Sequence, residues 1–332
     1  MITLKDIALE AGVSIMTVSN VINGKFSKVS PKTVEKIQAI IEKYNYTPNS
    51  AARSLSSRNS KIIALFMPGD DYENPHNVEA FNSIAHTISQ HGYYLMIFPN
   101  VNPEINSSNL KTWNIDGVIC FPPLNHADYA FFEKINIPTC FIDSYHDSSK
   151  ILKVGLDDYH GGYLAGKYLV DCGHTEIGFA SYKTSFDKIL KYRLDGFIEA
   201  LSSSGIVLKK ENIFIENTTY EGGMRVANQL SDCSSKITAI FATEDEMAIG
   251  IMTGARQNGI NVPKDLSVIG FDNIPICNYV TPSLTTISQD ISLKGKYAAE
   301  LLINLIETGK IEKNNIKIPL RIIERQSVIN RN

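Results

Sequence analysis

The stretch LKDIALEAGVSIMTVSN, residues 4–20, predicts two short helices joined by a sharp turn. Ala8 is small enough to let two helices cross closely, and Gly12 stands where the chain must turn through a positive φ. Val18 recurs at helical spacing, where it can seal the second helix against the first. Ala, Gly and Val at this spacing fit a helix-turn-helix, although any pair of helices in an α-helical core can share the pattern.

A third helix is predicted from Ser30-Pro31, because a capping serine followed by proline is a typical helix start. Its apolar face consists of Val34, Ile37, Ile41 and Tyr44. Thr47-Pro48 marks another start, but only about eight residues of helical character follow, and an isolated helix of that length is marginal in water. We expect this short segment to fold only when DNA or a partner orders it.

Charge divides the chain unevenly. The first 60 residues carry eight Lys and Arg against four Asp and Glu, a net charge of +4, whereas the remainder carries −7. A cationic end on an anionic body suits contact with phosphate at that end only. Four surplus charges alone are weak evidence, because many solvated surfaces carry as much.

Bulk composition limits the class of protein. At 332 residues, with 43% hydrophobic residues, the chain is long enough for two or three domains with a substantial core. No apolar run approaches the ~20 residues of a membrane span, and the chain begins with the helical pattern instead of a signal segment. We therefore expect a cytoplasmic protein. The five cysteines form no CxxC pair and are expected to be reduced core residues. The histidines show no metal-binding spacing, and no metal, cofactor or catalytic residue is predicted.

From residue 61 onward, short apolar runs alternate with helix-length segments. The runs cover 61–68, 93–98, 116–121, 137–142, 176–181, 212–216, 237–242 and 266–271. Repeated β-α-β order indicates an α/β body of parallel sheets with helices on both faces, arranged as two lobes with a cleft between them. Ligands bind at the carboxyl ends of strands in such sheets. Asp143, Glu244 and Asp272 all follow predicted strands.

The chain resembles the LacI/GalR family of bacterial regulators. In the first 55 residues the similar segments are LKDIALEAGVS, TVSNVING, VSPKTVEKIQAIIEKYNYTPN and ARSL. Further similar segments follow in order through the body: IDGVI, GHTEI, RLDGF, EMAIG, VIGFD and PSLTTI. The resemblance implies an all-α helix-turn-helix headpiece joined to a two-lobed core that resembles periplasmic sugar-binding proteins.

The resemblance also implies specific DNA contacts. The base-reading positions are Ile15, Met16 and Asn20, and the backbone-positioning residues are Thr17, Ser19 and Asn23. Leu55, with Ala52, is the implied minor-groove wedge of the hinge segment, which would kink the DNA. Two apolar side chains and an asparagine favour thymine methyl groups and adenine, so we expect an operator rich in A·T at those positions.

The effector positions implied by the resemblance are Arg193, Asp272, Asp143, Glu244, His76 and Asn77. Arg193 alone could equally form a surface salt bridge, and Asp272 could cap the next turn. The expected cleft is rich in acceptors and holds one clear cation, so several carboxylates would repel a phosphate. We therefore favour a neutral sugar or polyol over a sugar phosphate or a purine.

The predicted domains are a headpiece at 1–46, a hinge at 47–59, a first core subdomain at 60–157 with 289–317, and a second at 158–288 with 318–332. No heptad segment follows the core, which favours a homodimer. The leading hypothesis is a repressor whose binding to double-stranded operator DNA is controlled by a small sugar or polyol. A corepressor-dependent regulator and a sugar-binding module without gene control stay as alternatives. An enzyme is disfavoured, because the GxxxxGK at 161–167 precedes Tyr168 and lacks the Ser or Thr of a phosphate-binding loop.

Overall fold

A computed structural model describes residues 2–46, 59–67, 74–99, 101–122, 124–146, 148, 151–182, 188–232, 237–311 and 313–332. The chain divides into two compact units, Met1–Ser60 and Lys61–Asn332. The predicted hinge residues Ala52 and Leu55 lie outside the described residues.

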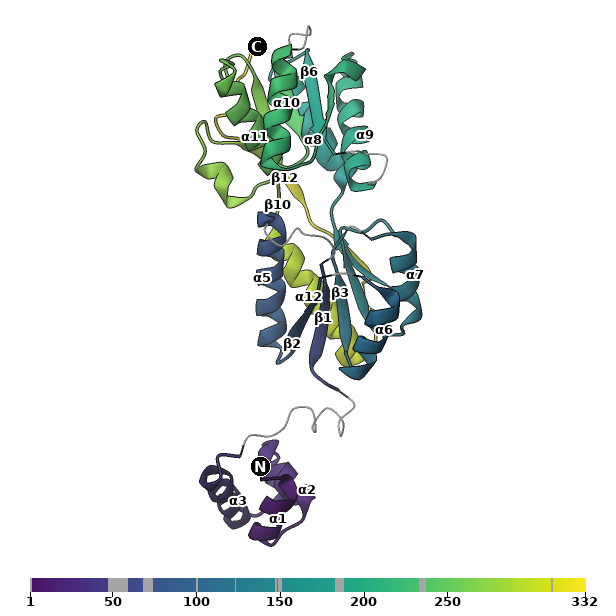
Figure 1. Ribbon diagram of the computed structural model, residues 1–332, viewed down its shortest axis with the longest axis vertical. Helices are drawn as coiled ribbons and strands as arrows, with labels where there is room; N and C mark the ends of the chain where they lie inside the picture. The colour runs from purple at the N-terminus through teal and green to yellow at the C-terminus, as the bar shows by residue number, and fades with distance from the viewer. Residues whose placement is uncertain are drawn as a thin grey trace. The chain divides into compact units, whose positions relative to one another are not determined.

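The first unit is the three-helix headpiece, drawn in purple in Figure 1, with helices α1 (Leu4–Ala11), α2 (Ile15–Ile22) and α3 (Pro31–Lys43) and the short 3-10 helix η1 (Phe26–Lys28). Thr3 and Asp6 form a reciprocal capping box at the start of α1, and Gly12 ends that helix with a φ of 68°. The apolar faces of the three helices share one core, formed by Ile7, Ala8, Ala11, Val18, Val21, Ile37 and Ile40. The predicted helix-turn-helix is confirmed.

The second unit is an α/β body with two six-stranded sheets, as the alternating pattern predicts. The first sheet has the order β11-β5-β4-β3-β1-β2 and is parallel throughout. Its strands are β1 (Ile62–Phe66), β2 (Tyr94–Phe98), β3 (Gly117–Cys120), β4 (Thr139–Ile142), β5 (Leu152–Gly155) and β11 (Asn315–Lys317). We call this sheet and its helices the first lobe.

The second sheet has the order β12-β10-β9-β8-β6-β7, and only the β10–β12 pair is antiparallel. Its strands are β6 (Ile177–Ser181), β7 (Ile213–Ile215), β8 (Ala239–Ala242), β9 (Ser267–Asp272), β10 (Thr285–Gln289) and β12 (Leu320–Ile323). We call this sheet and its helices the second lobe. The chain passes between the two sheets after β5, after β10 and after β11.

Helices cover both faces of each sheet (Figure 1). The first lobe holds α5 (Pro75–Gln90), α6 (Pro103–Thr112), α7 (His126–Lys134) and α12 (Ile291–Thr308). The second lobe holds α8 (Asp158–Asp171), α9 (Lys188–Ser202), α10 (Tyr220–Asp232) and α11 (Asp245–Gln257), with the 3-10 helices η3 (Lys210–Asn212) and η4 (Pro275–Asn278). Strand residues alternate between the two faces: Ile63 and Leu65 belong to one core cluster, and Ala64 and Phe66 to the other.

Several local expectations are also settled. The GxxxxGK segment lies within α8, so it is not a phosphate-binding loop. Cys120, Cys140 and Cys277 are buried free thiols, as predicted, whereas Cys172 is only half-buried. Cys233 lies outside the described residues. Among the described helices, none is both long and apolar enough to cross a lipid bilayer.

Candidate functional site

The start of α2 presents the predicted base-reading side chains. Ser14 caps this helix by accepting a hydrogen bond from the Thr17 backbone N–H at 3.1 Å. The cap leaves the first turn exposed, and Ile15 and Met16 have 49% and 70% of their surface in solvent. Two apolar side chains this exposed are not used by the headpiece core, which suits them for contact with another molecule. Asn20 is half-buried on the same helix.

The predicted backbone-positioning residues hydrogen-bond within the headpiece. The Thr17 hydroxyl lies 2.9 Å from the Ser14 hydroxyl. The Asn23 side-chain amide donates to the Ser19 carbonyl at 2.8 Å and to the Ser19 hydroxyl at 3.2 Å. These bonds fix the ends of α2, so the residues are already ordered for a partner; their contact with phosphate stays a prediction.

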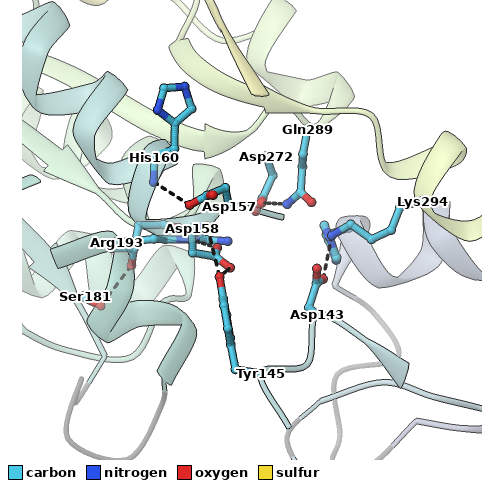
Figure 2. A network of polar contacts seen from close by, with 12 residues as sticks. Asp143, Tyr145, Asp157, Asp158, His160, Ser181, Arg193, Asp272, Gln289 and Lys294 are labelled. Carbon is cyan, nitrogen blue, oxygen red and sulfur yellow. Dashed lines mark hydrogen bonds and ion pairs between the residues drawn. The ribbon is translucent and has the colours of Figure 1, made fainter. Parts of the chain in front are cut away.

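The second candidate site is a polar cluster at the carboxyl ends of the strands in both lobes (Figure 2). Arg193, on α9, lies at its centre with only 6% of its surface exposed. Its Nε donates to Asp158 Oδ1 at 2.9 Å, and its Nη1 donates to the Thr243 carbonyl at 2.7 Å. The guanidinium carbon lies 3.5 Å from the centre of the Phe271 ring. Arg193 is therefore a buried anchor, and the surface salt bridge allowed by the sequence is wrong.

Asp158 is the partner of Arg193, and sequence reasoning did not identify it. It is the first residue of α8 and is 1% exposed. Its Oδ2 accepts the Tyr145 hydroxyl at 2.8 Å, so a residue from the first lobe contacts the second. Burial raises the pKa of Asp158, against the lowering charge of Arg193. The sequence did contain one signal for it, the acidic pair 157–158 at the start of a helix.

Asp272 ends β9 with a φ of 114°, a conformation that is rare for a side chain of this kind. Its carboxylate accepts the side-chain N–H of Gln289, the last residue of β10. The predicted alternative was that Asp272 caps the turn that follows it. That alternative is wrong, because the N–H of Ile274 in this turn donates to Asp245 instead, at 3.0 Å. Gln289 is another site residue that the sequence did not reveal.

Glu244 follows β8 and remains half-buried. Burial and the charge of Asp272 raise its pKa to about 8, although Arg193 and a hydrogen bond from Thr218 oppose the shift. The next residue, Asp245, is structural, because its carboxylate accepts the Thr286 hydroxyl at 2.6 Å as well as the Ile274 N–H. Only Glu244 of this acidic pair is left to face a ligand.

The first lobe contributes Asp143, which follows β4, and Lys294 from α12. Lys294 is fully buried, and its Nζ lies 2.6 Å from Asp143 Oδ2 and 3.5 Å from His76 Nε2. His76 in turn contacts Asn77, with 3.1 Å between Nδ1 and Oδ1. The expectation of one clear cation is wrong: Arg193 and Lys294 are both buried there. Sequence reasoning missed Lys294 because a lysine in a helix usually faces solvent.

Two buried acceptors in this cluster receive no hydrogen bond from any described residue: Asp143 Oδ1 and Gln289 Oε1. A cavity of about 240 Å³ adjoins the first-lobe side, lined by Asp143, Ser144, Tyr145, Lys153, Gly155, Leu156, Asp158, Asn315 and Lys317. The buried atoms lack donors, which a bound molecule can supply. Among the described residues no cluster of His, Cys, Asp or Glu is arranged to hold a metal ion.

Comparison with known proteins identifies the family and supports the fold. Residues 3–49 match the model for bacterial regulatory proteins of the lacI family, and residues 167–328 match a periplasmic binding protein-like domain. The repressor PurR of Vibrio parahaemolyticus is 32% identical, over 99% of both chains. The ribose operon repressor of Haemophilus influenzae is also 32% identical over 99% of both. A lac repressor dimer bound to operator and the anti-inducer ONPF has a TM-score of 0.88, with 27% identity and 99% coverage of each chain.

Proposed function

Because the chain belongs to the lacI family of bacterial regulatory proteins, we propose that it is a cytoplasmic transcriptional repressor without catalytic activity. It binds operator DNA as a homodimer, and a small sugar or polyol in the cluster around Arg193 controls that binding. The observation that carries this proposal is the buried group of Arg193, Asp158 and Asp272. It combines a fork of donors with one carboxylate at the start of α8 and another at the end of the parallel strand β9.

DNA recognition rests on α2. A helix-turn-helix places its second helix in the major groove with its N-terminal residues against base edges. Ile15 and Met16 are exposed in that first turn, and Asn20 lies one turn further along. The hinge residues Ala52 and Leu55, outside the described part of the chain, are proposed to enter the minor groove. Thr17, Ser19 and Asn23 are proposed to hold the backbone.

Effector control rests on contacts between the lobes. Tyr145 of the first lobe bonds Asp158 of the second, and Asp158 holds Arg193. A ligand that accepts hydrogen bonds from Arg193 or donates them to Asp158 therefore alters the contact that joins the lobes. To move an equilibrium from 1:99 to 99:1, the ligand must prefer one arrangement by about 10⁴-fold. We propose that the preferred arrangement is the one that releases DNA, with corepression as the alternative.

The test begins with selection of an operator from random duplexes by the full-length protein. Operator binding is then measured by fluorescence anisotropy with hexoses, pentoses, polyols, sugar phosphates and purines. The same compounds are ranked by thermal shift, where a ligand at 100 times its Kd adds about 2.7 kcal/mol. A carbohydrate that both stabilises the protein and weakens operator binding supports the proposal. A response confined to phosphates or purines contradicts it, and tighter operator binding identifies a corepressor.

A further inference from the structure

The buried charges of the cluster do not balance. Arg193 is matched by Asp158 at 2.9 Å, and Lys294 is matched by Asp143 at 2.6 Å. Each buried cation therefore has one carboxylate of its own. Asp245, Asp272 and Glu244 are left over, and none of them forms an ion pair with any residue that the structure describes. The Asp245 carboxylate accepts hydrogen bonds from Thr286 and Ile274, so Asp272 and Glu244 are the two that can face a ligand. Asp272 is buried and Glu244 is half-buried, and carboxyls that leave water without an ion-pair partner are costly to keep ionised.

Two buried atoms without a hydrogen-bond partner also indicate that the cluster lacks donors. Gln289 gives its side-chain N–H to Asp272, and its Oε1 accepts nothing from the described residues, although the residue is 4% exposed. Asp143 Oδ1, on the facing lobe, is likewise unsatisfied. Figure 2 shows Gln289 beside Asp272, on the side of the cluster that faces Lys294 and Asp143. Both of these unfilled buried atoms are acceptors, so a molecule that fills them must carry donors.

We propose that the effector is a carbohydrate that carries a cationic amine, whose ammonium lies against the Asp272 and Glu244 carboxyls. An ammonium has three N–H donors and no acceptor, so it supplies both the charge and the hydrogen bonds that the cluster lacks. The hydroxyl groups of the same molecule are donors for Asp143 Oδ1 and Gln289 Oε1. This inference rests on the proposed function. It narrows the small sugar or polyol proposed there to an amino sugar or an aminated polyol, in place of the neutral ligand favoured by the sequence.

The charge on Glu244 couples ligand binding to protons. Its pKa is raised to about 8 by burial and by Asp272, with Arg193 opposing the rise and Glu246 adding to it. Glu244 is therefore mostly protonated at pH 7, and an ammonium beside it drives off that proton. Binding of an amino sugar releases a proton at pH 7, whereas binding of a neutral sugar leaves Glu244 protonated.

The test is isothermal titration calorimetry on the full-length protein. The probes are D-glucosamine, D-galactosamine and D-mannosamine, each with its parent hexose and its N-acetyl derivative, in which the charge is removed. The proposal expects at least one amine to bind tenfold or more tightly than both of its matched compounds, because charge-assisted hydrogen bonds are about twice as strong as neutral ones. The heat of that titration should depend on the ionisation enthalpy of the buffer, which reports the released proton.

Glu244→Gln removes one excess carboxyl at constant size and should abolish the preference for the amine over its parent sugar. Glu199→Gln, on the exposed side of α9, is the matched control and should keep that preference. The proposal is overturned if a parent hexose or N-acetyl sugar binds as tightly as the amine, or if none of the amines binds at millimolar concentration. If a neutral sugar releases the operator and no amino sugar does, only the proposal of a cationic amine is overturned. If no carbohydrate changes operator binding, the proposed function is overturned too.

Discussion

The Tyr145 hydroxyl lies 2.8 Å from Asp158 Oδ2, and this hydrogen bond joins the first lobe to the second. The Tyr145 ring also packs on Tyr192 of α9, with 4.5 Å between ring centres. Because Asp158 is also the ion-pair partner of Arg193, Tyr145 connects the first lobe to the buried charges of the second lobe.

Tyr145→Phe should keep the ring contact and lose the hydrogen bond. Removing a hydrogen bond to a buried carboxylate lowers the free energy of unfolding by about 1–3 kcal/mol. We also expect a change in the effector concentration needed for half-release of the operator, because one contact between the lobes is gone. Urea unfolding and operator anisotropy measure the two effects. Tyr192→Phe, which removes the hydroxyl of the other tyrosine in this ring pair, is the control, and an equal effect in both variants would show that the Tyr145–Asp158 bond is not the source.

Arg193→Ala should lower the free energy of unfolding by about 3–5 kcal/mol, because Asp158 then becomes a buried charge without a partner. It should also eliminate the response to effector. The double variant Arg193→Met with Asp158→Asn should recover most of the stability but not the response. Urea unfolding measures the stability of both variants. If the double variant is no more stable than Arg193→Ala, the unpaired Asp158 charge is not the source of the lost stability.

Close packing of α8 against α9 should tolerate no added methyl group at Gly162. A Cβ there would lie 1.8 Å from the Arg193 carbonyl oxygen, so α9 must move. Gly162→Ala is expected to cost about 1–3 kcal/mol, typical of overpacking, and to weaken effector binding by displacing Arg193. Gly178→Ala is the control, since its nearest contacts are at 3.4 Å. Thermal melts and calorimetry check both effects, and equal melting temperatures for the two variants would contradict the argument.

The stability of the body should depend on His174. Its Nδ1 lies 2.9 Å from the Thr238 hydroxyl and its Nε2 lies 3.2 Å from the Ile329 carbonyl, and burial lowers its pKa from 6.5. The unfolded chain therefore takes up a proton before the folded chain does. Stability from this group is full above pH 6.5 and is lost as the pH falls toward the lowered value. His174→Asn should flatten that part of the curve of unfolding free energy against pH, with His91→Asn as control.

In the headpiece, Asn20→Ala should reduce discrimination at a single operator position. A bidentate contact between asparagine and adenine is worth about 1–3 kcal/mol against the wrong base. The salt dependence of binding should not change, because no phosphate contact is removed. Competition between operators that differ at one base pair measures this. Uniform weakening across all duplexes would make Asn20 a backbone contact.

Much of the fold could be predicted because burial leaves a pattern in sequence. The runs at 61–68 and 237–242 contain strands because both faces of a parallel sheet are covered. Asp143 and Glu244 follow such strands, and Asp272 ends one. Strands β5, β10, β11 and β12 were not among the predicted runs. All four are short and mix polar with apolar residues, and β11 and β12 also lie at sheet edges. Lys294 and Asp158 were missed for another reason: their partners are distant in sequence, and only the tertiary fold brings them together.

The three passages between the sheets have a consequence for cutting the molecule apart. The first lobe is completed by α12 and β11, which follow all of the second lobe except β12 in the chain. A fragment ending after β5 would leave that strand as a bare edge and would expose the apolar surface that α12 covers. Neither lobe can therefore be made by simple truncation. Inside the cell, a ribosome must deliver almost the entire chain before the first lobe can close, so chaperone protection is most needed late in synthesis.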